Sequence, residues 1–285
     1  MKMSKAKTPI ALAVGILLGL GASNAFADGH MNDVVHIMPQ TDPVEKGMEM
    51  YAHGEARSGL TYASEETRTL QADDFENPAF LWVEKSEEEW SKVDGDAGKS
   101  CQTCHGDVSE MKGVGTQYPK YDPEVDDLLN LEKRINMCRS EGMQATPWKW
   151  ESDELLGMTA LVKMQSRGMP VKVDIEGPAK EYFEKGMEYY NKRVGQMDLA
   201  CKHCHVDQNG NYMRAELLSQ GQANGFPTYR LKWQKLGSLH RRFRGCNNNI
   251  RATKLKPGSP EYMALELYVT WRGNGLPVET PSVRK

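Results

Sequence analysis

Apolar residues recur at helical spacing in two segments of the chain. Residues 151–171 read ESDELLGMTALVKMQSRGMPV, and residues 258–278 read GSPEYMALELYVTWRGNGLPV. Serine precedes each pattern at an N-cap position, and Pro260 stands at a first helical position, where its missing N–H is not needed. The positions three or four residues apart that predict one apolar helix face are Leu155, Met158, Leu161 and Val162, and then Tyr262, Leu265, Tyr268 and Val269.

These two predicted helices close the copies of an internal repeat. Residues 45–51 read EKGMEMY and residues 184–190 read EKGMEYY, and each is interpreted as the opening helix of a copy. The stretch 168–178 is rich in glycine and proline, which predicts the boundary between the copies. Residues 55–98 contain acidic runs such as SEEEW and are interpreted as a solvated insertion in the first copy.

The first 27 residues have the pattern of a secretory signal peptide. Three lysines precede an apolar run from Ile10 to Leu20, and Ala25 and Ala27 give the small-x-small pattern of a cleavage site. The apolar run is shorter than the roughly 20 residues that span a bilayer. Cleavage after Ala27 is predicted, which gives an exported, periplasmic chain of 258 residues.

The net charge and the mean hydropathy of the chain limit the classes of partner that we expect it to bind. The formal net charge is −3, and it becomes −6 when the three leader lysines are removed. A mildly acidic chain has no bulk attraction for nucleic acid or for anionic membranes, so neither is expected as a partner. The mean hydropathy is −0.64, and a large apolar cofactor would help such a polar chain to fill its cores.

The six cysteines include two copies of the haem attachment signature C-x-x-C-H. Residues 101–105 read CQTCH and residues 201–205 read CKHCH. Two thiols three positions apart can reach both vinyl groups of one porphyrin, and the next histidine becomes an axial ligand of the iron. Disulfides, a redox C-x-x-C pair and zinc use the same residue types, but two matches in one exported chain favour two covalent haems c. The predicted attachment residues are Cys101, Cys104, Cys201 and Cys204, and the predicted proximal ligands are His105 and His205.

The predicted fold is therefore mainly α, with two tandem cytochrome c-type haem domains related by the internal repeat. The first is placed at residues 28–172 and the second at residues 173–285. Each copy would contain an opening helix, a haem motif, a lone cysteine and a closing helix.

Two cysteines lie outside the motifs, at equivalent places in the repeat. Cys138 lies in RINMCRSEG and Cys246 in RFRGCNNNI. A disulfide between them is one interpretation, and ligation of the irons by methionine, His53 or His240 is another. Because equivalence suggests one role for both, we favour each cysteine as the distal ligand of its own haem.

The surroundings of Cys246 are the more cationic. Within five residues on either side it has a formal charge of +4, against +2 for Cys138. Cationic surroundings stabilise a thiolate, and arginine holds oxyanions through paired hydrogen bonds. A solvated face or haem-propionate partners would also use such arginines, but the cluster as a whole favours anion binding. The cluster comprises Arg241, Arg242, Arg244 and Arg251.

With both haem motifs, both lone cysteines and the stretch RFRGCNNNIRA, the chain resembles the SoxA family over nearly all of its mature length. This family supplies the dihaem subunits of the SoxAX cytochrome of bacterial sulfur oxidation. Some members lack the first haem motif, and this chain resembles the branch that keeps it.

The resemblance implies a function and a set of site residues. It implies an L-cysteine S-thiosulfotransferase that pairs with a monohaem cytochrome, SoxX, and oxidatively joins thiosulfate to a cysteine of the SoxYZ carrier protein. Cys138 would be the distal ligand of the first haem. Cys246, carried as a persulfide, would be the distal ligand of the second haem and the active-site sulfur. Arg242 would bind the substrate, and Arg272 is a further candidate for holding the anion.

Two other functions suit the same motifs. A dihaem thiosulfate dehydrogenase would couple two thiosulfates to tetrathionate without a carrier. A simple dihaem electron-transfer cytochrome would need no reactive thiol.

Overall fold

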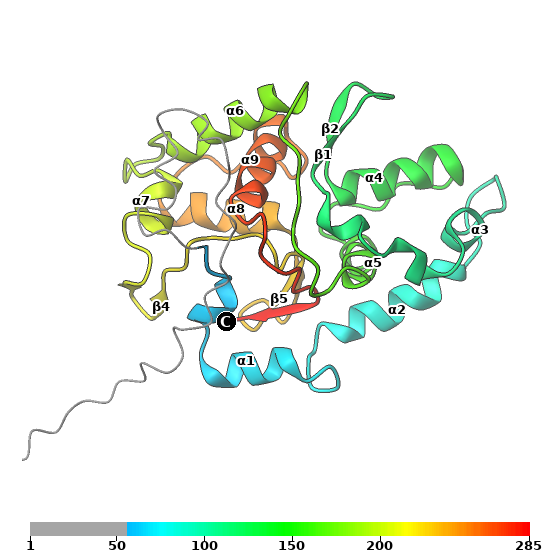
Figure 1. Cartoon of the computed structure of the whole chain (residues 1–285), viewed down its shortest axis with the longest axis horizontal. Helices are drawn as coiled ribbons and strands as arrows, with labels where there is room; N and C mark the ends of the chain where they lie inside the picture. The colour runs from blue at the N-terminus through cyan, green and yellow to red at the C-terminus, as the bar shows by residue number, and fades with distance from the viewer. Residues whose placement is uncertain (1–55) are drawn as a thin grey trace, which may run out of the picture.

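The computed structural model describes residues 56–285 (Figure 1). The predicted signal peptide and the segment EKGMEMY lie outside the described residues. Within this range the chain is mainly α, as expected. Its helices are α1 (Glu65–Ala72), α2 (Phe80–Ser91), α3 (Cys101–His105), α4 (Leu131–Met137), α5 (Asp153–Met164), α6 (Ala179–Asn191), α7 (Cys201–His205), α8 (Leu239–Asn249) and α9 (Pro260–Trp271).

Short strands form three small sheets between the helices. The hairpins β1–β2 and β3–β4 are two-stranded, and the third sheet has the order β6–β5–β7, with β7 parallel to β5. The strands are β1 (Lys120–Asp122), β2 (Asp127–Leu129), β3 (Tyr212–Met213), β4 (Glu216–Leu217), β5 (Thr228–Arg230), β6 (Lys235–Gly237) and β7 (Ser282–Arg284).

The two predicted closing helices are confirmed. The Ser152 side chain accepts a hydrogen bond from Leu155 N at the start of α5, and the Ser259 side chain accepts one from Tyr262 N at the start of α9. Each closing helix packs against an earlier helix, α5 against α2 and α9 against α6. In Figure 1 the first pair lies to the right and the second to the left.

The interpretation of SEEEW as a solvated insertion is wrong for part of the stretch. These residues belong to α2, in which Val83, Ser86 and Trp90 are buried. Trp90 precedes Cys101 by the same spacing that separates Tyr190 of α6 from Cys201, so α2 is the counterpart of α6. The acidic residues face solvent, while the few apolar residues of the same helix face α5.

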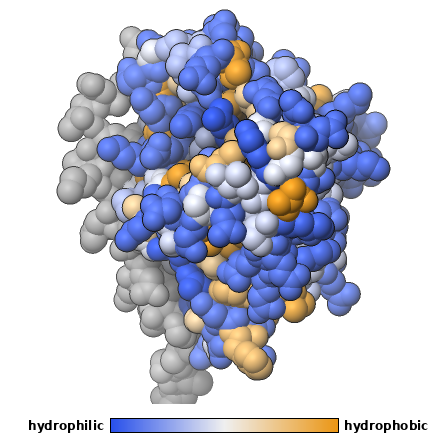
Figure 2. All heavy atoms as spheres, turned by 90° about the vertical axis from the view of Figure 1, so that its right-hand side faces the viewer, coloured by the Kyte–Doolittle hydropathy of each residue, from blue (hydrophilic) through white to orange (hydrophobic). Residues whose placement is uncertain are grey.

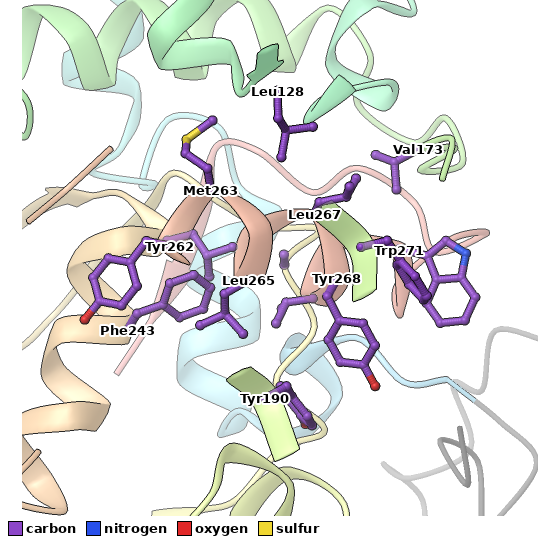
Figure 3. Packing of buried hydrophobic residues seen from close by; sticks show 14 of the residues in the cluster. Leu128, Val173, Tyr190, Phe243, Tyr262, Met263, Leu265, Leu267, Tyr268 and Trp271 are labelled. Atoms are coloured by element: carbon purple, nitrogen blue, oxygen red, sulfur yellow. The ribbon is translucent and has the colours of Figure 1, made fainter. Parts of the chain in front are cut away.

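The two halves of the structure exchange their β-hairpins. Leu128 of β2 is fully buried in the core around α6 and α9, where it lies among Met263 and Leu267 (Figure 3). Its counterpart in the repeat, Leu236 of β6, is fully buried in the core around α2 and α5. Each hairpin therefore adds a leucine to the core of the other half, while Leu129 of β2 stays in the core around α2 and α5.

The predicted boundary segment pairs with its own counterpart at the end of the second copy. Val171 N donates to Leu276 O, and Val278 N donates to Met169 O, with an antiparallel bridge between Pro170 and Pro277. Residues 57–77 also contact the C-terminal half; for example, Asn77 Nδ2 donates to the Pro281 carbonyl at 2.9 Å.

The face that carries α2, α3 and α4 is mostly hydrophilic, with scattered apolar side chains (Figure 2). Within residues 56–285, no helix combines the length and the apolar character needed to cross a membrane.

Candidate functional site

The second C-x-x-C-H motif forms the short helix α7. All five of its residues, Cys201 to His205, are half-buried. His203, the histidine inside the motif, caps the start of the helix, because its Nδ1 accepts a hydrogen bond from Ala200 N at 2.9 Å. Because His203 is engaged in this contact, His205 is the histidine of the motif that remains available for another role.

His205 is oriented by a backbone carbonyl. Its Nδ1 lies 2.8 Å from the Ser219 carbonyl oxygen, which can only accept, so Nδ1 is the donor and Nε2 is the ring nitrogen left for another partner. Such a second bond to a backbone carbonyl is typical of metal-ligating histidines. The loop approaches the ring closely at Gly221, where φ is +74° and an added Cβ would lie 2.8 Å from Nδ1.

Cys246 reaches this cluster from α8. Burial would raise the pKa of its thiol, but the charge of Arg242, a hydrogen bond with His205 and the charges of His205 and Arg230 lower it to about 6. The sulfur and the His205 imidazole are therefore neighbours in the structure. Cys246 also influences the pKa values of Cys201 and Cys204, so the three sulfurs of the second copy gather at one place.

The first copy brings together Cys101, Cys104 and Cys138 in the same way. The motif helix α3 begins with a reciprocal cap between Ser100 and Thr103, and Cys138 stands where α4 changes into a π-helical turn, Cys138–Gly142. Burial raises the pKa of the Cys138 thiol despite the charge of Arg134. The two lone cysteines thus differ in the direction of their pKa shifts.

The first cluster is also the more open of the two. Cys104 and His105 are exposed, whereas Cys204 and His205 are half-buried. The ring of His105 lies 6.0 Å from that of Trp90, centroid to centroid.

The donor set of each cluster fits a covalently bound haem. Two thiols and a histidine share one short helix, and a further thiol comes from a separate helix. The fit is most complete in the second copy, where the bond of His205 Nδ1 to the Ser219 carbonyl leaves Nε2 as the atom that could bind iron, and Gly221 leaves room for the imidazole ring.

Two alternatives for the lone cysteines are not supported by the structure. All six cysteines are free thiols, so no disulfide joins Cys138 to Cys246. His240 has both ring nitrogens engaged: Nδ1 accepts from Gly258 N at 2.9 Å, and Nε2 lies 2.9 Å from a Glu266 carboxylate oxygen. His53 lies outside the described residues.

The two candidate arginines occupy different places. Arg242 lies one helical turn before Cys246, and its charge is the largest of those that lower the pKa of that thiol. Arg272 ends α9 and is almost fully buried, with its Nη1 donating to Tyr190 Oη at 2.5 Å and to the Gln220 carbonyl at 3.1 Å. Its charge acts on Cys201 and Tyr190.

Sequence reasoning missed three contributors to the second cluster. These are Ser219, Gly221 and Arg230. The first two lie in a loop without a distinctive pattern. Arg230 could have been found by aligning the two copies beyond the cysteines, because it occupies the position that corresponds to Asp122 in the first copy.

Comparison with known proteins shows which protein family this chain is similar to. A family model described as SoxA/TsdA, cytochrome c domain, matches residues 85–171, a range that begins within α2. A cytochrome c domain implies covalently bound haem c. The chain is also similar to a solved structure, the crystal structure of SoxXA from P. pantotrophus. The TM-score is 0.79 and the identity 43%, and the match covers 81% of this chain and 88% of the other.

Similar proteins of known name agree with this. The chain is 48% identical to the L-cysteine S-thiosulfotransferase subunit SoxA of Pseudaminobacter salicylatoxidans over 249 residues, which cover 87% of this chain and 84% of the relative. It is 47% identical to the subunit of the same name from Rhodovulum sulfidophilum, over 81% of this chain and 80% of the relative. On this similarity and on the geometry of the two cysteine clusters, the chain belongs to the SoxA family.

Proposed function

We propose that this protein is the SoxA subunit of an L-cysteine S-thiosulfotransferase that conjugates thiosulfate to a cysteine of the SoxYZ carrier protein. Its partner is the monohaem cytochrome SoxX, and it acts in the periplasm after removal of residues 1–27. The relatives' names and the similarity to SoxXA support this assignment. The observation that carries it is the cluster in which Cys246 of α8 lies beside His205 and the two motif cysteines, with Arg242 one helical turn before it.

The residues divide into two haem-binding sets. Cys101 and Cys104 would attach the first haem, and His105 and Cys138 would bind its iron. Cys201 and Cys204 would attach the second haem, and His205 and Cys246 would bind its iron. The two sets belong to tandem cytochrome c-type domains, residues 28–172 and 173–285, and the haems supply one-electron redox chemistry when bound.

The overall reaction joins two reduced sulfurs. A new S–S bond forms between the carrier thiol and thiosulfate, the thiol proton leaves to solvent, and two electrons leave one at a time by way of the SoxX cytochrome to a further electron acceptor. Arg242 attracts and orients the thiosulfate dianion, because a guanidinium holds an oxyanion through two parallel hydrogen bonds. Cys246, carried as a persulfide, is the sulfur at which the substrate is received, and Arg272, whose charge acts on Cys201, is a second candidate for holding the anion.

Replacement of Cys246 by alanine tests the assignment. In the haem-loaded complex with SoxX, intact-mass spectrometry should still show two covalently attached haems, because the attachment thiols are unchanged. Conjugation of thiosulfate to SoxYZ should be lost. Asn248→Ala, an exposed position two residues further on, is the matched control and should keep activity. Full conjugation by the Cys246→Ala complex would refute the proposal, and tetrathionate formation by the isolated chain would favour a thiosulfate dehydrogenase instead.

A further inference from the structure

The orientation of His205 depends on the loop that follows its motif. The Ser219 carbonyl accepts from His205 Nδ1 at 2.8 Å, and Gly221 lies so close to the ring that an added Cβ would meet it. Gly221 N also donates to Ser219 Oγ at 3.2 Å, which links the two ends of this short segment. The position of the imidazole therefore follows the position of residues 219–221.

Arg272 holds the middle of this loop. Its Nη1 donates to the Gln220 carbonyl at 3.1 Å and to Tyr190 Oη at 2.5 Å, so both hydrogens of Nη1 are engaged by oxygens of the protein. Arg272 is 1% exposed, and its guanidinium lies over the Tyr190 ring, 4.6 Å from the centroid. Hydrogen bonds and ring contact together fix the guanidinium, which makes it a rigid support for the Gln220 carbonyl.

The Gln220 side chain is held from another direction. Its Oε1 accepts from Arg57 N at 2.8 Å and from Gln222 Nε2 at 3.2 Å. Arg57 belongs to the segment before α1, so the loop is held between that segment and the end of α9. Because these contacts are made to Gln220, they act on the His205 ring through the loop.

The first copy holds the corresponding loop from the same place. The sequence offset between the two lone cysteines also relates Gly113 to Gly221, and both glycines have a positive φ, +87° and +74°. Ser166, two residues after α5, accepts at its Oγ from Gly113 N at 3.0 Å. In both copies a side chain that follows the closing helix thus holds the loop beside the haem motif. The contact of Arg272 is therefore a feature of the repeat, made in the second copy by a charged group.

We propose that Arg272 is a positioning residue for His205, which it holds through the Gln220 backbone, and that Tyr190 keeps Arg272 in place. Arg272 is a candidate for holding the anion, but its Nη1 is given to two oxygens of the protein, and this favours support of the loop over contact with substrate. Groups that orient a metal-ligating histidine affect the metal site without touching it. This inference rests on the proposed function for the role of His205 as a ligand of haem iron.

Substitutions at Arg272 and Tyr190 test the proposal in the oxidised, haem-loaded complex with SoxX. Arg272→Lys keeps the charge without the planar fork, Arg272→Gln removes the charge, and Tyr190→Phe removes only the hydroxyl that binds Nη1. Electron paramagnetic resonance records the low-spin haem signals, and the signal that changes in Cys246→Ala identifies the second haem. Gln165→Ala is the control, because Gln165 takes the position of Arg272 in the first copy and donates to the Leu161 carbonyl of its own helix at 3.1 Å.

We expect the second-haem signal to shift or split in both Arg272 variants without thiosulfate, because the imidazole loses its fixed orientation when the loop is released. Tyr190→Phe should give a smaller change of the same kind. The kcat should fall about 10-fold in Arg272→Gln and less in Arg272→Lys, while KM for thiosulfate changes little because Arg242 is unchanged. The other haem signals and the haem content should match the parent, as should every measurement on Gln165→Ala.

Tyr190→Phe and whichever Arg272 variants carry two covalent haems decide the outcome. A parental second-haem signal in these proteins would overturn the inference, as would an equal change in Gln165→Ala. A raised KM with an unchanged signal would also overturn it, because Arg272 would then contact the anion. The proposed function fails differently: if the parent complex does not conjugate thiosulfate but the variants change the second-haem signal, the assigned reaction is wrong and the positioning role stands.

Discussion

Replacing Glu132 by glutamine should remove a pH dependence from the stability of the folded protein. Glu132 is 6% exposed and lines a small cavity between the two halves. Burial and the nearby Glu266 carboxylate raise its pKa from the ordinary 4.5 to about 7. Glu266 accepts from Asn130 Nδ2 at 2.8 Å and lies 2.9 Å from His240 Nε2. Burial and the neighbouring carboxylate therefore favour the protonated form of Glu132.

The sign of the effect follows from proton binding. Between pH 4.5 and about pH 7 the folded state binds a proton at Glu132 that the unfolded state has released, so the free energy of unfolding falls as pH rises through this window. A pKa raised from 4.5 to about 7 corresponds to about 3 kcal/mol lost across it. Lys163 faces the same cavity, and burial lowers its pKa, which gives stability of the opposite slope at higher pH.

Urea unfolding of the haem-loaded protein at pH 4.5, 6 and 7.5 measures the effect. Glutamine cannot titrate, so the difference between the Glu132→Gln variant and the parent should shift in favour of the variant by about 3 kcal/mol from pH 4.5 to 7.5. The groups common to both proteins largely cancel in that difference. Glu124→Gln, at an exposed position, should parallel the parent. A Glu132→Gln curve that also parallels the parent would show that Glu132 carries no proton in the folded state.

Two further substitutions test the geometry of the second cluster. Gly221→Ala should disturb His205, because the added Cβ would lie 2.8 Å from Nδ1, and the haem absorbance should shift or haem content fall. Gly210→Ala has a similar positive φ, +82°, with open space around the new Cβ, so an equal spectral change there would contradict the argument. Asn247→Ala should lower the free energy of unfolding by about 1–3 kcal/mol, because its buried Nδ2 lies 3.0–3.1 Å from two tyrosine hydroxyls and a backbone carbonyl. Asn248 is exposed, so Asn248→Ala should keep the thermal unfolding midpoint of the parent protein. If Asn247→Ala had the same midpoint as Asn248→Ala, the reasoning would be disproved.

Local sequence signals predicted the closing helices well. Ser152 and Ser259 are N-caps in the structure, and the apolar faces of α5 and α9 are buried as the spacing indicated. The sequence did not identify α2 as the counterpart of α6, because EKGMEMY, which lies outside the described residues, has a sequence more similar to that of α6. In α2 the buried positions Val83, Ser86 and Trp90 lie among acidic residues that dominate the local composition.

The sequence pattern of each β-hairpin could not predict which half of the structure its leucine packs against. Leu128 and Leu236 are apolar strand residues whichever half they pack against, so their alternation carries no information about the partner. The site contributors Ser219 and Gly221 were missed for a related reason: a backbone carbonyl acts as an acceptor whatever side chain it belongs to. Only the cysteine and histidine spacing, which follows from the chemistry of haem attachment, identified site residues directly.

The internal repeat also explains why the two copies carry different charges at some corresponding positions. Corresponding positions of the two copies lie close together around the central cavity. If the two copies had identical sequences, each ionisable side chain there would lie beside a second copy of itself. Three such pairs are Glu132 with His240, Thr159 with Glu266, and Lys163 with Thr270. In each pair an acid or a base corresponds to a residue of different charge. The two acids Glu132 and Glu266, which belong to different pairs, still line the same cavity, and this proximity helps to raise the pKa of Glu132.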